Sequence, residues 1–274
     1  MDSAALDARA YSEGEQFQRE KRTLFARAWL PFCAAAQVAS PGDFVSHSLG
    51  GWPLFAIRGK DGVLRAFHNT CRHQQMPVIE KPTGRCDMLR CRYHGWTYDL
   101  AGALSVAPPM VAPPDPTSVR LGSVELAECD PMVLVRIEAG AEAAPALADR
   151  GQRMAATTTT DAACNWKTYV EALLAASDWQ LTWPIALRRT VEGLTVVRQV
   201  VPRSFIRTRI VEFVFGDTVD DALRGRIAAA SAADRAAAEA LQEQRAGGIL
   251  ASDSAGVRDF RARVAAASAD GAPP

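Results

Sequence analysis

Two short segments of the chain each place a cysteine close to a histidine: Cys71-Arg-His73 and Cys91-Arg-Tyr-His94, with seventeen residues between them. A Rieske-type [2Fe–2S] cluster needs this set, because two thiolates bind one iron and two imidazoles replace thiolates on the other. Neutral imidazoles add less negative charge than thiolates, so such a cluster is easier to reduce than an all-cysteine cluster. The four side chains therefore predict a carrier of single electrons.

A structural zinc ion is the alternative occupant, since two Cys and two His also form tetrahedral zinc sites. The cysteine-then-histidine order of both segments, their β-type context and the following Gly95–Tyr98 run favour the cluster. The cysteines are expected to bind the buried iron, and the histidines the outer iron near the surface. We expect Trp96 and Tyr98 to pack around the cluster loop, with a hydrogen bond from the Tyr98 hydroxyl to a ligand thiolate.

The other histidines and cysteines have no partner at ligand spacing. Six cysteines in 274 residues do not make the dense disulfide framework of a small secreted domain. We interpret the histidines as packing or surface residues and the cysteines as small hydrophobes; they are His47, His68, Cys33, Cys86, Cys129 and Cys164.

Composition limits the partners. With 31 basic and 31 acidic side chains the formal net charge is zero, so no long-range field attracts nucleic acid or an anionic membrane. Residues 1–10 contain no apolar segment, and nowhere do about eighteen apolar residues run together. We therefore expect a cytoplasmic protein that binds neither nucleic acid nor membrane.

The elements that position the four side chains are expected to be mainly β-strands. A helix is predicted first, from about residue 12 to 29, because Ser12 and Glu15 have the spacing of a capping box. Between 38 and 137, apolar runs at 54–57 and 64–67 flank the turn signal at 59–62 and predict a hairpin. Residues 108–116 hold five prolines and predict a stiff loop, and 132–137 predict the closing strand.

The second half of the chain mixes helix and strand, after a boundary near residues 139–160. A helix is predicted at 166–176 and strands at 194–201 and 205–215. Alanine-rich helices are predicted around 228–244 and 257–267.

The cluster segment resembles a known family. Asn69-Thr-Cys-Arg-His73, Met76-Pro77, Cys91-Arg-Tyr-His-Gly-Trp-Thr-Tyr98 and Gly102-Ala-Leu104 make residues 20–140 similar to the Rieske domain of ring-hydroxylating oxygenase α subunits and related Rieske monooxygenases and demethylases. The resemblance implies an α+β protein with an N-terminal helical arm (1–37), an all-β Rieske [2Fe–2S] domain (38–140) and a truncated helix-grip-like α+β domain (141–274). Met76 and Trp96 stand where respiratory Rieske proteins have a disulfide cysteine and a hydrogen-bonding serine, which implies a lower potential.

The family also holds a mononuclear iron in its C-terminal domain, bound by two histidines and one carboxylate. The opening signature of that domain is similar to Asn165-Trp-Lys167 with Glu171. The ungapped alignment then puts Ala175 at the acid that links cluster and iron, and Asp178 and Trp183 at the two histidines. No histidine follows residue 94, so the resemblance implies a degenerate site without mononuclear iron.

Asp234 matches the third ligand, because Glu239 and Gln242 follow it at the family's spacing. The alternative is that Asp234 only caps the start of an alanine-rich helix. Asp178 and Asp234 could hold a hard divalent ion, but two carboxylates without imidazole make a poor ferrous oxygenase site. The segment between Pro184 and Asp234 is shorter than in full α subunits, which argues for a reduced or absent substrate pocket.

These features favour an auxiliary, α-like subunit of a heteromeric Rieske non-haem iron oxygenase. In a trimeric or hexameric assembly it would accept electrons from a flavin reductase or ferredoxin and pass them to an iron-bearing α subunit. Three alternatives stay open: a complete Rieske mono- or dioxygenase with unusual metal ligands, a stand-alone Rieske electron carrier, and a protein in which the cluster only staples its loops.

Overall fold

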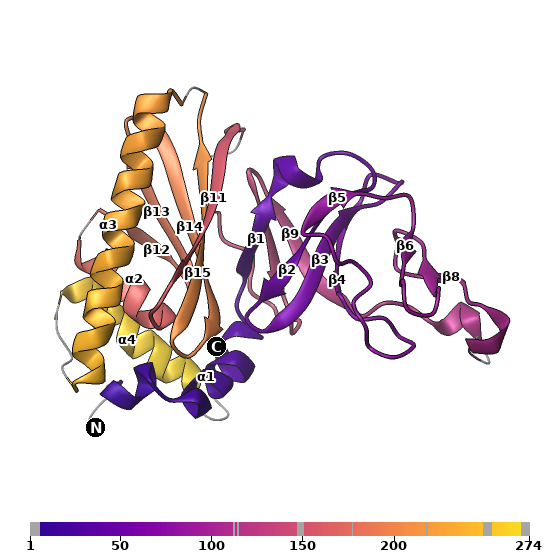
Figure 1. Cartoon of the computed structure of the whole chain (residues 1–274), viewed down its shortest axis with the longest axis horizontal. Coiled ribbons are helices and arrows are strands. Elements are labelled where there is room, and N and C mark those ends of the chain that lie inside the picture. The colour runs from indigo at the N-terminus through magenta and orange to yellow at the C-terminus, as the bar shows by residue number, and fades with distance from the viewer. Residues whose placement is uncertain are drawn as a thin grey trace.

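The computed structural model describes residues 6–111, 113, 115–146, 151–176, 178–217, 219–248 and 254–269. It has two halves joined side by side, one mainly β and one with helices covering a sheet (Figure 1). Among the described residues, no helix combines the length and the apolar character needed to cross a membrane.

The β half contains two antiparallel sheets. The larger has the strand order β1-β10-β9-β4-β3-β2-β5, and the smaller has the order β6-β7-β8. The larger sheet consists of β1 (Leu30–Ala34), β2 (Asp43–Leu49), β3 (Trp52–Arg58), β4 (Leu64–His68), β5 (Thr83–Arg85), β9 (Ser123–Cys129) and β10 (Met132–Arg136). The smaller sheet consists of β6 (Leu89–Arg90), β7 (Thr97–Tyr98) and β8 (Leu104–Val106).

The hairpin and the closing strand predicted for this half are confirmed as β3–β4 and β10. One strand was not expected: Leu30–Ala34, placed in the arm from sequence, pairs with β10 as β1. Three short helical turns complete this half: η3 (Ala35–Val38), η4 (Pro109–Val111) and η5 (Pro116–Ser118). The last two break up the proline-rich loop, of which residues 112 and 114 lie outside the described residues.

The second half is an antiparallel sheet of order β11-β15-β14-β13-β12 with helices on one side (Figure 1). Its strands are β11 (Met154–Ala162), β12 (Gln180–Thr182), β13 (Ala186–Val191), β14 (Leu194–Ser204) and β15 (Arg207–Phe215). Its helices are α2 (Trp166–Ala175), α3 (Asp221–Ala246) and α4 (Ala255–Ser268). The helices and strands predicted for this half are confirmed, although α3 begins earlier than expected and both C-terminal helices are longer.

The N-terminal arm is less regular than predicted. It consists of η1 (Ala8–Tyr11), α1 (Gly14–Glu20) and the π-helical turn η2 (Lys21–Phe25), not one helix from 12 to 29. The predicted capping box is wrong: the N-cap of α1 is Glu13, and the Ser12 hydroxyl donates to the Ala8 carbonyl instead. The reason is local, because Asp7 already caps the preceding turn and Ser12 ends that turn.

Two apolar layers hold the halves together. The largest core cluster combines arm residues such as Phe25 with Trp166 of α2 and Phe260 of α4, so the arm packs into the second half. A second layer joins strands β1 and β10 to the opposite face of the second sheet, with Leu134 and Phe213 among its buried members. A separate cluster fills the interior of the cluster-loop region around Tyr98.

Candidate metal centre

The predicted ligand pairs lie in two loops with the same backbone geometry. The Cys71 N–H donates to the Met76 carbonyl at 2.8 Å, and the Gln75 N–H donates to the Cys71 carbonyl at 2.9 Å. The loop after Cys91 repeats both bonds, at 2.8 and 3.0 Å. The fifth residue of each loop has a positive φ, 61° at Gln75 and 74° at Gly95. Each loop therefore presents its cysteine and histidine in the same way.

The four side chains converge between these loops. The cysteines are buried, with 1 % and 2 % of their surface exposed, whereas His73 is half-buried and His94 is exposed. The two imidazole rings meet edge to face with centroids 4.6 Å apart. Burial raises the pKa of the Cys91 thiol, so iron must displace a proton when it binds there. The thiols thus lie inside and the imidazoles outside, while their assignment as ligands stays a prediction.

The residues fit a metal cluster. The Nδ1 atom of His73 is buried and has no hydrogen-bond partner, which would be costly for a nitrogen that bound nothing. None of the six cysteines forms a disulfide, so both thiols in the loops are available. A bound Rieske cluster would supply reversible one-electron transfer at this place.

Aromatic side chains surround the loops as expected. The Tyr98 hydroxyl accepts a hydrogen bond from the Arg72 N–H at 3.0 Å, and its oxygen lies 3.3 Å from Cys71 Sγ. Its own proton is therefore free to point at the sulfur, as predicted. The Trp96 indole stacks on His73 with centroids 5.1 Å apart and donates to the Val111 carbonyl.

Within the part of the chain that the structure describes, no three His, Cys, Asp or Glu side chains are grouped closely enough to hold one metal ion.

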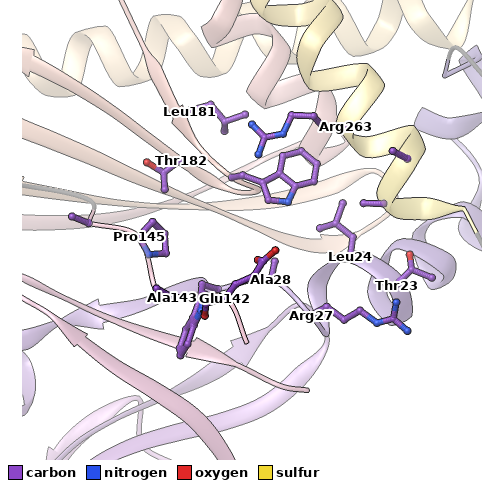
Figure 2. Close-up of a pocket in the computed structure, with 15 residues that line it drawn as sticks. Thr23, Leu24, Arg27, Ala28, Glu142, Ala143, Pro145, Leu181, Thr182 and Arg263 are labelled. Atoms are coloured by element: carbon purple, nitrogen blue, oxygen red, sulfur yellow. The ribbon is translucent and has the colours of Figure 1, made fainter. Parts of the chain in front are cut away.

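The positions matched to the mononuclear iron site make contacts of other kinds. Ala175 and Asp178 are exposed at the end of α2, and Asp178 forms an ion pair with Arg189 at 3.2 Å. Trp183 lies elsewhere, in a cleft of about 680 Å³ between the arm, residues 142–146, β12 and α4. Figure 2 shows Arg263 extending from α4 into this cleft, and its guanidinium lies 4.6 Å from the Trp183 ring centre.

Asp234 lies in the middle of α3, so the idea that it caps a helix is wrong; Asp220 is the N-cap. Its carboxylate accepts a hydrogen bond from the guanidinium of Arg198 at 2.7 Å. Arg198 is fully buried and also donates to Glu212 at 2.8 Å and to the Tyr169 hydroxyl at 3.2 Å. Sequence reasoning missed this network, although an arginine in the middle of the apolar run 194–201 signals a buried anionic partner.

The signature that opens the second half is structural. The Asn165 side chain caps α2 by accepting from the Lys167 N–H, and the Lys167 ammonium binds Glu20 of the arm at 2.6 Å with both side chains fully buried. Glu171 accepts hydrogen bonds from Tyr11 of the arm and from two arginines of the C-terminal helices, Arg245 and Arg261. These buried charges fix the arm against α2.

Comparison with known proteins agrees with the cluster site. Residues 28–126 match the family model "Rieske [2Fe-2S] domain". The chain is 36% identical over 102 residues to the chlorobenzene dioxygenase subunit alpha of Cupriavidus sp. (strain PS12), covering 37% of this chain and 23% of that protein. It is 29% identical over 191 residues to the carnitine monooxygenase oxygenase subunit of Escherichia coli K12, covering 64% and 50%. The first alignment thus spans about a quarter of the relative's length.

The fold comparison extends over the whole chain. The crystal structure of the quaternary ammonium Rieske monooxygenase CntA with L-carnitine superposes with a TM-score of 0.83 at 20% identity, covering 97% of this chain and 96% of that one. A naphthalene 1,2-dioxygenase structure gives 0.72 at 15% identity, covering 98% and 93%.

Residues 28–126, which carry the two matched loops, therefore form a Rieske [2Fe–2S] domain. Over this segment the chain is similar to proteins named as Rieske oxygenase α subunits, and the whole chain shares their α+β fold.

Proposed function

We propose that this chain is an auxiliary, α-like subunit of a Rieske non-haem iron oxygenase that relays electrons to the iron of a partner subunit. The observation that carries the proposal is the contact between Asp234 and Arg198. The carboxylate that matches the third iron ligand is bound to a fixed cation, so a guanidinium takes the electrostatic role of a metal ion. Both matched histidine positions hold other residues, and no histidine follows residue 94.

The surface of the cluster loops supports docking of another protein. Of the six large apolar side chains that are exposed among the described residues, four lie between residues 88 and 110: Met88, Tyr93, Val106 and Met110. Residues 71–95 also carry five basic and two acidic side chains in a chain of zero net charge. This region is the end of the molecule farthest from the second half (Figure 1). Arginine, tyrosine and methionine are enriched at protein interfaces.

Within the proposal, His73 and His94 mark the point where electrons enter and leave, because they lie nearer the surface than the cysteines. The donor would be a flavin reductase or a ferredoxin, and the acceptor an iron-bearing α subunit in a trimeric or hexameric assembly. A cytoplasmic location is part of the proposal.

A complete oxygenase is the second candidate, because the fold match with CntA covers almost the whole of both chains. Iron analysis separates the two: the relay subunit holds two iron atoms and two labile sulfides per chain, and a complete oxygenase holds three iron atoms. A stand-alone carrier is disfavoured, since the arm and the second half share one buried core that such a carrier does not need.

The decisive experiment uses the complex of this chain with its iron-bearing partner subunit. Substitution His94→Ala should abolish the Rieske paramagnetic resonance signal and lower turnover by orders of magnitude. The matched control is Cys86→Ser, which changes a half-buried cysteine of the same half and should leave both unchanged. Normal turnover of the His94→Ala complex, or three iron atoms in the isolated chain, would refute the proposal.

A further inference from the structure

A small cavity lies between helix α3 and the sheet edge formed by β11 and β15. Its volume is about 210 Å³, and its walls are largely apolar, with Ala156 and Val214 from the sheet and Ile227 and Ala228 from the helix. A protein cavity of about 150 Å³ can hold benzene, and drug-sized ligands need about 300 Å³ or more. The space therefore suits a molecule with a short apolar body.

Glu212 of β15 lines this cavity, and one of its two carboxylate oxygens accepts no hydrogen bond from the described residues. The side chain is 5 % exposed, and its Oε2 accepts from Arg198 Nε at 2.8 Å and from the Ser231 hydroxyl at 2.7 Å. No hydrogen bond reaches Oε1 from the residues that the structure describes. This oxygen has no donor among those residues, so a ligand in the cavity can donate a hydrogen bond to it.

Arg198 contacts two carboxylates, those of Glu212 and Asp234, so its single positive charge is shared between them. A ligand ammonium group would supply the donor that Glu212 Oε1 lacks.

Two cationic side chains, Arg224 and Arg235, also line the cavity. Arg235 lines it and follows Ser231 by four residues, so the two stand on the same face of α3 with Cβ atoms about 5–6 Å apart. Arg235 is half-buried, and within the described ranges it makes neither an ion pair nor a hydrogen bond. Glu212 and Arg235 thus face one cavity with opposite charges and do not pair with each other.

We propose that this cavity binds a small zwitterionic amino acid with an apolar side chain. The ammonium group donates to Glu212 Oε1, the carboxylate binds Arg235, and the side chain lies against Ile227 and Val214. An uncharged ligand would leave both charged groups unsatisfied, an amine alone would leave Arg235 unpaired, and a simple carboxylate would leave Glu212 Oε1 without a donor. The site goes beyond electron relay and needs no chemistry at the metal centre.

The test is calorimetric titration of the holoprotein with glycine, alanine, valine and leucine, and with the half-ligands 3-methylbutylamine and 4-methylpentanoate. At least one amino acid with an apolar side chain should bind, and each half-ligand should bind about tenfold more weakly or worse. Arg235→Gln should weaken amino-acid binding by the same factor while the amine binds as before. Ala228→Phe should fill the cavity and abolish binding.

The matched control is Arg226→Gln on the same helix, which makes the same charge change at an exposed arginine that pairs with Glu192 instead of lining the cavity. It should bind the amino acid as the unmodified protein does. The Rieske resonance signal should be the same in every variant, which shows that each one is folded. The proposal is overturned if no amino acid binds at millimolar concentration, or if binding is insensitive to both Arg235→Gln and Ala228→Phe.

Discussion

Removal of one hydroxyl group at Tyr98 should lower the reduction potential of the cluster. The Tyr98 oxygen lies 3.3 Å from Cys71 Sγ and already accepts the Arg72 N–H, so we expect its own proton to be donated to the sulfur. A hydrogen bond donated to a ligand sulfur stabilises the reduced cluster more than the oxidised one, because the reduced cluster carries more negative charge. Tyr98→Phe should therefore make the cluster harder to reduce.

The size of the shift follows from the strength of one hydrogen bond. A net contribution of about 1 kcal/mol, which is typical for a protein hydrogen bond, corresponds to roughly 40 mV for a one-electron couple. Because the contact of 3.3 Å is long for a hydrogen bond, we expect the potential to fall by about 40 mV or less. The same change leaves the Arg72 N–H without its acceptor and should also cost about 1 kcal/mol of stability.

The assay is a redox titration followed by paramagnetic resonance, with Tyr93→Phe as the matched control. Tyr93 is 41 % exposed in the same loop, and it contacts the Cys91 sulfur through its backbone N–H, which Tyr93→Phe keeps, so its hydroxyl should not matter. A Tyr98→Phe potential equal to or above that of the unmodified protein, with the cluster intact, would show that the hydroxyl does not donate to the sulfur.

Three further predictions concern stability. Gly102→Ala should cost about 1–3 kcal/mol of unfolding free energy, because φ is +84° and a Cβ atom would lie 2.6 Å from Phe67 Cε1; Gly225→Ala, in the open on α3, should instead stabilise by about 0.5–1 kcal/mol in the same denaturant titration. Burial lowers the pKa of His47, so the unfolded chain binds the extra proton first and stability should fall as pH drops below about 6.5. Denaturant titrations between pH 5 and 7 should show a shallower fall for His47→Gln, and an unchanged slope would contradict this. Chelation of the iron should lower the thermal midpoint of the β half, since the buried thiols then lose their ligand; equal midpoints with and without iron would argue that the cluster contributes nothing to stability.

The cluster site was the most predictable part of the molecule, because the two ligand pairs are short segments. Cys71 and His73 are fixed relative to each other by one turn of the backbone, and the same holds for Cys91 and His94. In the second half, α2, β14 and β15 could be predicted because they bury apolar patterns that local periodicity reports, whereas the strands β11, β12 and β13 were missed.

What the sequence did not reveal depends on contacts between distant residues. The pairing of β1 with β10 joins segments about a hundred residues apart, and Pro31 ends the predicted helix without indicating that a strand with so distant a partner follows. The contact between Arg198 and Asp234 depends on how α3 crosses the sheet. The capping box at Ser12 failed because a second cap, Asp7, competes for the same stretch.

The course of the backbone inserts the Rieske half between two segments, the N-terminal arm and the second half, that pack together as one unit. The arm is held to this unit by the buried ion pair of Glu20 and Lys167. The chain leaves the unit and returns to it at one place, where the Glu138 N–H donates to the Ala26 carbonyl at 2.8 Å. Two adjacent chain connections restrain the Rieske half far more than a single flexible linker would. The end of the Rieske half that carries the cluster loops cannot swing toward a distant acceptor, so any redox partner must dock against it.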